Sequence, residues 1–565
     1  MPSFTARAVL VLQLLSLLYH AACAQGHDDH SEPPKLGAVA SESKVCSNIG
    51  IEVLKSGGNA ADAMVATHFC VGVIGMYHSG VGGGGFLLVR SSNGSYEFVD
   101  FRETAPGAAF QDMYNNDTDL SLYGGLASGV PGAVRGMEYL HEHYGSLSWR
   151  ELILPSVKLA REGFTVTQDL INYIAQTTPN SSFLTDDPAW AIDFAPTGTL
   201  VKLGETMTRK RYADTLETIA NYGADAFYEG AIANATIAAL TASGGIMTIE
   251  DLKNYTAVTR KPGQIKYHNY TVTATTAPSG GTVALSALNI AGGYDLGDPS
   301  KINLTTHLID ESLRFAYGQR VNLGDPSFVD LVAYQEFMLS DATAAEIRAN
   351  ISFTHTLNVS AYNPDGYEEL PTPGTSHMVT ADKSGMAVSS TNTINLLFGS
   401  QVIVPETGVI MNDEMNDFSI PGSSNAFGYI PSPVNYVAPG KRPLSSISPA
   451  IVETHDGKLY FVSGSAGGSR IISAVVQLVH HTLDQQMTAP EGLAQPRLHD
   501  QLVPNQVSFE YAYNNSTVAY MASLGCNVTW MAPGSSTAQS LRLLPNGTFE
   551  AAGEPRQLDS GGFAI

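Results

Sequence analysis

Residues 371–400 read PTPGTSHMVTADKSGMAVSSTNTINLLFGS and join a Pro/Gly-rich linker to a hairpin pattern. Residues 377–381 and 386–390 have the composition of two short strands, and a polar turn connects them. Gly374 lets the backbone bend at the Gly374–Thr375 bond in ways that other residues do not permit. We therefore expect Thr375 to stand at the very start of a strand, directly after a bend in the chain.

A cut between Gly374 and Thr375 would give Thr375 both a hydroxyl and a free α-amine. In such a residue the amine takes the proton of the hydroxyl, which makes the hydroxyl oxygen a nucleophile. A Pro/Gly-rich loop that simply leads into a hairpin is the simpler interpretation of the same residues. Motifs elsewhere in the chain are needed to choose between these two interpretations.

Further short motifs occur in both halves of the chain. They are G-V-G-G-G-G-F at 80–86, F-R-E-T-A-P at 101–106, G-T-S-H at 374–377, T-x-N at 393–395, N-D-E-M-N-D-F-S at 412–419, P-G-K-R-P-L-S-S at 439–446 and G-S-A-G-G at 464–468. Together these motifs closely resemble the gamma-glutamyltranspeptidase family of N-terminal-nucleophile hydrolases. The resemblance covers nearly the whole chain after residue 40.

The resemblance implies an α/β fold, a four-layer αββα sandwich of the N-terminal-nucleophile hydrolase type. It also implies one precursor that cuts itself at Gly374–Thr375. We expect residues 25–374 to form a large subunit and residues 375–565 a small, catalytic one, both within one layered unit. Length alone would suggest three or four domains, but no long linker divides the chain.

The activity that the resemblance implies is transfer of a γ-glutamyl group from glutathione and related donors. The acceptor is water, an amino acid or a dipeptide, and the intermediate is a γ-glutamyl ester of Thr375. This chemistry needs neither a cofactor nor a metal, and no Cys/His spacing indicates a zinc site. Two alternatives stay open: a related acylase that acts on a different acyl group, and a non-catalytic secreted glycoprotein with the same fold.

Arg102 follows a predicted hairpin of residues 86–90 and 96–100. In an acidic chain a single arginine is ordinarily a surface counter-charge. The resemblance implies instead that Arg102 holds the α-carboxylate of the donor, which suits the rigid guanidinium group. It implies also that Ser445 and Ser446, otherwise ordinary loop residues, donate hydrogen bonds to that carboxylate.

Glu414 and Asp417 stand three residues apart, so a helical turn would put both carboxylates on one side. An acid/base pair of the glycosidase kind is one interpretation, but the surrounding motif favours binding of the donor's ammonium group. Thr393 and Asn395 stand two apart, on one face of a predicted strand. Thr393 is placed to bond to Thr375 and Asn395 to face the substrate, although polar strand residues also serve neighbouring backbone groups.

A second predicted hairpin, residues 450–454 and 459–463, leads to Gly467 and Gly468. These glycines are expected to open an amphipathic helix that runs to about residue 483. Because N–H groups at a helix start are unpaired, both are candidates for an oxyanion hole, where each donor is worth about 3 kcal/mol. A glycine-rich turn without a catalytic role fits the same pattern.

The glycines at 80–85 match the G-x-G-x-x-G pattern of dinucleotide-binding folds. Their context is the reverse of that motif, because a predicted helix precedes them and a predicted strand follows. Close backbone packing is the better interpretation. The helical patterns at 132–144, 149–161 and 212–222 indicate scaffold, and Asn59 with Asp62 predicts the start of another helix.

The N-terminus has the features of a secretory signal. An apolar run at 8–18 follows Arg7, and Ala22-Cys23-Ala24 provides small residues for cleavage. We assign residues 1–24 to the signal and the mature start to Gln25; an uncleaved signal anchor is the alternative. No later stretch approaches the roughly 20 apolar residues of a membrane helix. The mature protein is therefore expected to be free of the membrane, either extracellular or vacuolar.

The composition excludes several classes of partner. The chain is 44% hydrophobic and only 15% charged, which indicates a large folded core. With 53 acidic against 30 basic residues, the formal charge of −23 argues against nucleic acid and anionic membrane surfaces.

Three cysteines remain after the signal, namely Cys46, Cys70 and Cys526, so one of them is unpaired within the chain. The family resemblance suggests a Cys46–Cys70 disulfide, which would contribute roughly 3 kcal/mol in the chain-entropy model. Candidate N-glycosylation sites are frequent, as expected in a eukaryotic secretory pathway. They are Asn93, Asn116, Asn180, Asn234, Asn254, Asn269, Asn303, Asn350, Asn358, Asn514, Asn515, Asn527 and Asn546.

Overall fold

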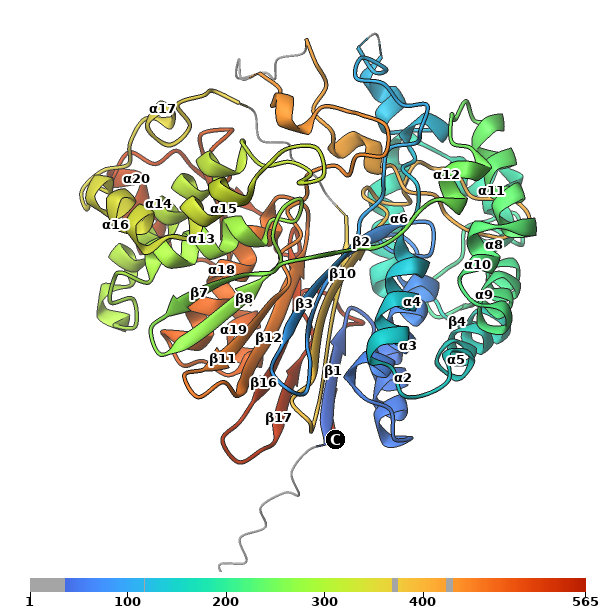
Figure 1. Ribbon diagram of the computed structural model, residues 1–565, viewed down its shortest axis with the longest axis horizontal. Helices are drawn as coiled ribbons and strands as arrows, with labels where there is room; N and C mark the ends of the chain where they lie inside the picture. Colours follow the sequence, from blue (N-terminus) through green and yellow to red (C-terminus); the bar gives the residue numbers. More distant parts are fainter. Residues whose placement is uncertain (1–35, 116, 368–373, 423–429) are drawn as a thin grey trace, which may run out of the picture.

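Two antiparallel sheets lie face to face in the computed structural model, which describes residues 36–115, 117–367, 374–422 and 430–565. Helices cover the outer face of each sheet, so helix, sheet, sheet and helix follow one another across the molecule (Figure 1). The expected αββα sandwich is therefore confirmed.

The first sheet is seven-stranded, and the predicted hairpin after Gly374 lies in it as β9 and β10. Strand β1 comes from the first half of the chain but lies between β9 and β18, which both come from the segment after Gly374. In spatial order the strands are β18 (Gly561–Ala564), β1 (Gly37–Ser41), β9 (Ser376–Asp382), β10 (Ala387–Thr393), β2 (Gly84–Arg90), β3 (Tyr96–Phe101) and β6 (Val258–Arg260).

The second sheet is six-stranded and also combines both halves of the chain. Its order is β17 (Phe549–Ala552), β16 (Thr537–Leu543), β12 (Leu459–Ala466), β11 (Ala450–Thr454), β8 (Tyr270–Ala274) and β7 (Gly263–Tyr267). Two small sheets accompany it, one of β13 (Leu498–His499), β14 (Val507–Glu510) and β15 (Val528–Met531), the other of β4 (Phe164–Thr165) and β5 (Thr206–Met207).

Helices from the first half of the chain cover the first sheet, on the right of Figure 1. They are α2 (Lys44–Lys55), α3 (Ala60–Ile74), α4 (Ala133–Tyr144), α5 (Trp149–Glu162), α6 (Gln168–Thr177), α7 (Phe183–Asp186), α8 (Pro188–Phe194), α9 (Lys210–Tyr222), α10 (Asp225–Tyr228), α11 (Gly230–Ala242) and α12 (Ile249–Lys253).

Helices from both halves cover the second sheet, on the left of Figure 1. They are α13 (Gly281–Ala291), α14 (Ile302–Arg320), α15 (Val332–Leu339), α16 (Asp341–Asn350), α17 (Val359–Tyr362), α18 (Arg470–Leu483), α19 (Ala489–Ala494) and α20 (Asn515–Ser523).

Helix α3 begins where the sequence predicts it, because Asn59 and Asp62 form a reciprocal capping box. All of its residues are buried between the sheet and the outer helices, which explains why its sequence is apolar on every side. The disulfide Cys46–Cys70 joins α3 to α2, as expected, with its Cα atoms 5.3 Å apart. Cys526 is free and buried.

Strand β2 is buried on both faces, and its side chains alternate between two cores. Leu87 and Val89 pack against the first helical layer, whereas Phe86 and Leu88 contribute to the core that contains the second sheet. Gly80, Gly82 and Gly83 lie in the connection from α3 to β2, and Gly84 and Gly85 begin β2, which agrees with the packing interpretation. A Cβ on Gly83 would lie 2.0 Å from the carbonyl oxygen of Thr393, so these glycines let two backbones meet at the end of β10.

The predicted signal at residues 1–24 and the sequon at Asn116 lie outside the described residues, and so does the side chain of Asn180. The other sequon asparagines are exposed, except Asn303, which is half-buried. No helix in the described ranges has the length and apolar character needed to cross a bilayer.

Candidate active site

Thr375 directly precedes β9 and is buried, with 5% of its surface exposed. Its φ is 127°, a region in which a β-branched residue is strained. Gly374 has a φ of 103°, and a Cβ at this position would lie 1.6 Å from the carbonyl oxygen of Asn395. The Gly374–Thr375 bond is thus held in an unusual backbone conformation that leaves no space for a side chain at residue 374.

Thr393, the last residue of β10, lies beside Thr375. The Thr375 hydroxyl donates to the Thr393 Oγ1 across 3.5 Å, and Thr393 Oγ1 also accepts from the Asn395 backbone N–H at 2.8 Å. A hydroxyl that already accepts a backbone hydrogen bond keeps a defined orientation. The pair therefore has the arrangement that the sequence predicted for Thr375 and Thr393.

Asn395 does not lie on the strand, which corrects the expectation that it shares a strand face with Thr393. Strand β10 ends at Thr393, and Asn395 has a φ of 70°, in the left-handed region where asparagine is tolerated. Its side-chain amide donates to the backbone carbonyl of Asp413 at 3.0 Å. The Asp413 carboxylate accepts from the next N–H, that of Leu396, at 2.9 Å, so the loop after β10 is held against the segment that carries Glu414.

Gly467 and Gly468 connect β12 to α18 with φ values of 123° and 61°. The helix begins at Arg470, slightly later than predicted, because these backbone angles are not helical. A Cβ on Gly467 would lie 2.5 Å from the Ser535 carbonyl oxygen. The two glycines therefore form a tight turn next to Thr375, and both border cavities that Thr375 also lines.

Arg102 is 1% exposed and binds two carboxylates. Its Nη1 lies 2.5 Å from Glu414 Oε1, and its Nη2 contacts Asp417 Oδ2. Both acids belong to the short 3₁₀ helix η5 (Glu414–Asp417), which places them on one side as predicted. The same three residues line a cleft with Thr375, Ser445 and Ser446 that has only about 10 Å³ of free space.

Ser445 and Ser446 are both buried at this cleft. Ser445 Oγ accepts a hydrogen bond from the Ile447 backbone N–H at 3.2 Å, which leaves the hydroxyl hydrogen of Ser445 to donate elsewhere. Ser446 Oγ accepts from Arg320 Nη2 at 3.2 Å. The pair thus adds hydroxyl donors to the guanidinium group of Arg102.

Glu103 is a further acid of this site that the motif contained but that was given no role. Its carboxylate is fully buried, and burial raises the pKa of Glu103 from 4.5 to about 8 against the opposing effect of Arg102. Burial likewise raises the pKa of Glu414 well above its usual range. The site therefore gathers more carboxyl groups than Arg102 can neutralise.

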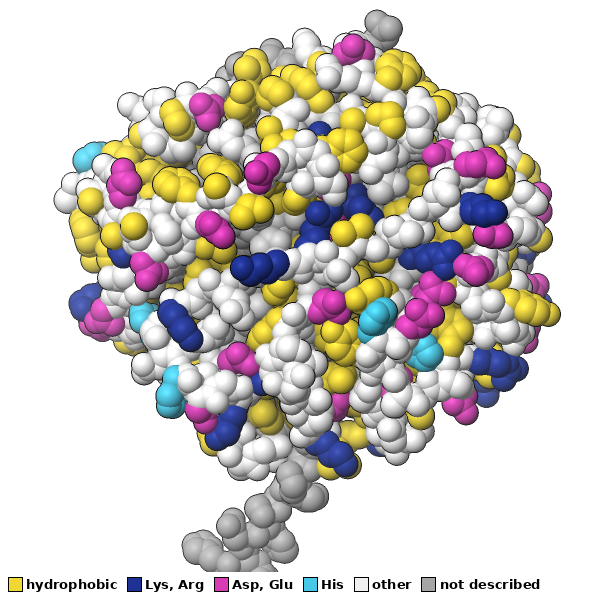
Figure 2. Space-filling model, in the orientation of Figure 1, with side chains coloured by type: hydrophobic (Ala, Val, Ile, Leu, Met, Phe, Trp, Pro, Cys, Tyr) yellow, Lys and Arg dark blue, Asp and Glu magenta, His cyan; other side chains and the backbone are white. Residues whose placement is uncertain are grey.

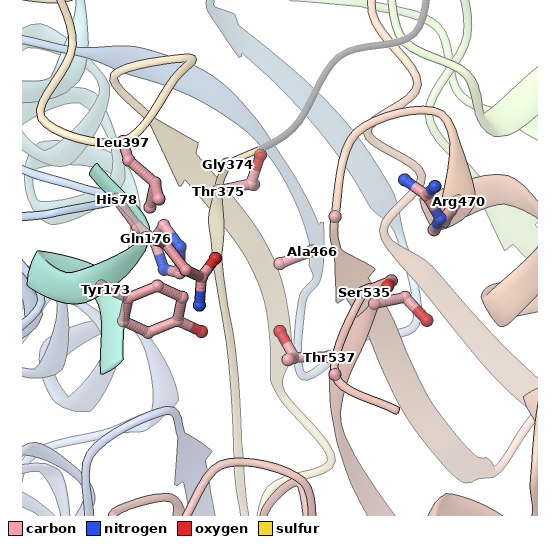
Figure 3. A pocket seen from close by; sticks show the side chains of 13 residues that line it. His78, Tyr173, Gln176, Gly374, Thr375, Leu397, Ala466, Arg470, Ser535 and Thr537 are labelled. Carbon is pink, nitrogen blue, oxygen red and sulfur yellow. The ribbon is translucent and has the colours of Figure 1, made fainter. Parts of the chain in front are cut away.

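A second, larger cavity opens on the other side of Thr375, with a volume of about 210 Å³. Figure 3 shows Tyr173, His78 and Gln176 on one wall and Ala466, Ser535, Thr537 and Arg470 on the other, with Gly374 and Thr375 between them. On the molecular surface, Lys and Arg side chains gather in a hollow near the middle of the face drawn in Figure 2. An acidic chain thus retains a local positive surface that suits anionic ligands.

Comparisons with known proteins agree on one family. The family model described as Gamma-glutamyltranspeptidase matches residues 46–563. A glutathione hydrolase proenzyme of Arthroderma benhamiae is 55% identical over 94% of this chain and 93% of its own length. A glutathione hydrolase of Aspergillus flavus is 51% identical over 94% of this chain and 90% of its own.

Among solved structures, the cephalosporin acylase from Bacillus halodurans superposes with a TM-score of 0.81 at 26% identity. The superposition covers 95% of this chain and 98% of the acylase.

Proposed function

Because the chain belongs to the gamma-glutamyltranspeptidase family, we propose that Thr375 is the nucleophile with which it transfers γ-glutamyl groups. The chain is an enzyme that transfers the γ-glutamyl group of glutathione and related compounds to water or to an amine. The observation that carries the assignment is the position of Thr375, which is buried, next to Thr393, and lines both cavities of the site.

Maturation comes first in this proposal. The Thr375 hydroxyl oxygen attacks the carbonyl carbon of Gly374, the C–N bond breaks, the hydroxyl proton passes to the departing Thr375 nitrogen, and an ester between Gly374 and Thr375 forms. Water then hydrolyses that ester, which leaves a carboxylate on Gly374 and a free amine on Thr375. The products are a large chain, residues 25–374, and a small one, residues 375–565. The strained φ of Thr375 favours this step, because the torsion no longer exists once the bond is cut.

Acyl transfer follows on the same oxygen. The amine of Thr375 takes the proton of its hydroxyl, and the oxygen attacks the γ-carbonyl carbon of the donor. The backbone N–H groups of Gly467 and Gly468 stabilise the negative oxygen that develops. The C–N bond to the leaving amine breaks, and the leaving amine takes up the proton that the Thr375 amine had accepted. A γ-glutamyl ester of Thr375 remains.

The donor's α-amino acid end occupies the cleft of Arg102 in this scheme. Arg102, Ser445 and Ser446 hold the α-carboxylate, while Asn395, Glu414 and Asp417 surround the α-ammonium group. Arg102 already pairs with Glu414 and Asp417, so a zwitterion enters by exchanging partners. The exchange leaves the net charge of the cleft unchanged, because the ligand brings one charge of each sign.

Water or an acceptor amine resolves the ester. For an amine, the nitrogen lone pair attacks the ester carbonyl, a C–N bond forms, the bond to Thr375 Oγ1 breaks, and the amine proton returns to Thr375.

Secretion and N-glycosylation are part of the proposal, supported by the N-terminal sequence and by the exposure of most sequons. The acylase alternative is not favoured, since relatives of much higher identity are glutathione hydrolases.

The test compares wild type with Thr375→Ala. Wild type should run as two unequal chains under denaturing conditions, and Edman sequencing of the smaller should begin Thr-Ser-His-Met. It should also hydrolyse a γ-glutamyl anilide and glutathione. Thr375→Ala should stay one chain and be inactive. A fully active wild-type protein that remains one uncut chain would overturn the proposal.

A further inference from the structure

The two cavities beside Thr375 have different walls. The larger one, of about 210 Å³, shares only Thr375 with the cleft that holds Arg102. Gly467 borders the larger cavity and Gly468 the smaller one. A carbonyl group bound at Thr375 between these glycines therefore directs one substituent into the Arg102 cleft and the other into the larger cavity.

Arg470 is the charged residue of the larger cavity. Among the described residues that line this cavity none is acidic, and burial and Tyr317, rather than a carboxylate, act on the pKa of Arg470 in the described part of the chain. Its Nε is buried without a hydrogen-bond partner there. Arg102, in contrast, is bound by two carboxylates. In a chain with 53 acidic and 30 basic residues, Arg470 is thus a cation left available to an anionic ligand.

Other groups of the cavity suit a short peptide. Ser535 and Thr537 provide hydroxyl groups on the wall of Arg470, and Gln176 and Tyr173 provide polar groups on the opposite wall (Figure 3). The cavity is also lined by Ser536. Arg470 is also the first residue of α18, whose N-terminus adds partial positive charge. It follows Gly467 by three residues and lines the same cavity, so it lies near the turn of Gly467 and Gly468. Two residues of extended peptide span about 7 Å, the scale of this space.

The proposed function already requires a space for the amine half of the substrate on this side of Thr375; resting on it, we infer that Arg470 is the residue that binds the terminal carboxylate of that half. The ligand class is a dipeptide with a free C-terminal carboxylate: the leaving group of glutathione during acylation, and an acceptor dipeptide during transfer. Arg470 is then a specificity-determining residue. It makes no contact with the γ-glutamyl group, which the Arg102 cleft holds.

The experiment measures transfer from a γ-glutamyl anilide to two acceptors, glycylglycine and glycylglycinamide, which differ only in the terminal carboxylate. The kcat/KM of wild type for glycylglycine should be about 10- to 100-fold higher than its kcat/KM for glycylglycinamide, which is the range for a hydrogen bond to a charged group. In Arg470→Gln this ratio should fall close to one, and Arg470→Lys should restore part of it. The matched control is Arg150→Gln, an exposed arginine on α5, which should keep the wild-type ratio.

Equal use of both acceptors by wild type would overturn the inference without any variant. An unchanged ratio in Arg470→Gln would also overturn it, since another group would then read the carboxylate. Failure of the proposed function looks different: wild type would release no aniline from the donor, whichever acceptor is present. If Arg470→Gln does not fold, the wild-type ratio and Arg470→Lys still decide the matter.

Discussion

The carbonyl oxygen of Asn395 occupies the space in which a side chain on residue 374 would begin, 1.6 Å from the Cβ position. Asn395 is itself fixed, because its amide donates to the Asp413 backbone. Residue 374, which precedes the proposed nucleophile, is therefore restricted to glycine by a loop whose Asn395 also lines the Arg102 cleft. In the proposed mechanism, the cutting of the chain and the binding of the donor therefore depend on the same piece of backbone.

We expect Gly374→Ala to slow or abolish maturation, because residue 374 must move away from Asn395 and leave its φ of 103°. A time course of freshly purified protein on denaturing gels measures this. Gly457→Ala is the matched control: Gly457 has a φ of 77° in the β11–β12 turn but open space around its Cβ position, so maturation should be normal. Cleavage of Gly374→Ala at the wild-type rate would contradict the importance of this contact.

Replacing Arg102 should affect both catalysis and stability. The donor carboxylate loses its charged partner, at a cost of roughly 2–5 kcal/mol, or on the order of 30- to 3000-fold in kcat/KM. Glu414 and Asp417 also lose theirs while buried, which costs about 3–5 kcal/mol of folding free energy. We expect Arg102→Ala to have a lower kcat/KM, mainly through a higher KM, and to unfold at a lower urea concentration than wild type. Cleavage should persist, because the Gly374–Thr375 bond carries no free α-carboxylate.

Arg102→Lys is the useful companion variant, since lysine keeps the charge but cannot form the forked contact. It should restore more stability than activity. A processed Arg102→Ala enzyme with undiminished kcat/KM would show that another residue holds the donor carboxylate, and would favour an acylase of different specificity.

Glu103 predicts a specific dependence of stability on pH. Burial raises its pKa from 4.5 to about 8, so the folded protein holds a proton that the unfolded chain releases earlier. This contribution is fully present below pH 4.5 and is lost as the pH rises to about 8. Glutamine mimics the protonated carboxyl group. As the pH rises from 4.5 to about 8, the unfolding midpoint of wild type should therefore fall relative to that of Glu103→Gln. Parallel unfolding midpoints across this range would contradict the assignment.

The cysteines predict a simple chemical map. Non-reducing peptide mapping should link Cys46 to Cys70. Cys526 is buried, and burial raises the pKa of its thiol, so a thiol reagent should label it only after unfolding. Cys46→Ala with Cys70→Ala should lower the unfolding free energy by about 3 kcal/mol. Rapid labelling of Cys526 in the native protein would contradict its burial.

Much of the site was predictable because its signals are local. The β9–β10 hairpin, the cap of α3 and the turn of Glu414 and Asp417 follow from short sequence patterns, and the structure contains all three. The position of Asn395 was not predictable in this way. Strand β10 ends at Thr393 because the loop is drawn to Asp413, a contact between segments that no periodicity reveals.

The burial of Glu103 and the absence of a carboxylate beside Arg470 in the described residues could not be predicted for the same reason. Glu103 is adjacent to Arg102 in the sequence, but its pKa is raised by burial, which arises only when distant segments pack around it. Arg470 acquires significance only because no carboxylate in the described residues reaches it and because α18 begins at the wall of a cavity.

The place of β1 between β9 and β18 has a consequence for the mature protein. Once Gly374–Thr375 is cut, a strand of one chain is hydrogen-bonded on both edges to strands of the other, and the second sheet is shared as well. The two chains then cannot come apart without opening both sheets, so association and folding are one process. Dilution should leave specific activity constant, and the chains of different molecules should never exchange: the proposed two-chain enzyme would be a heterodimer by composition, but one without a subunit equilibrium.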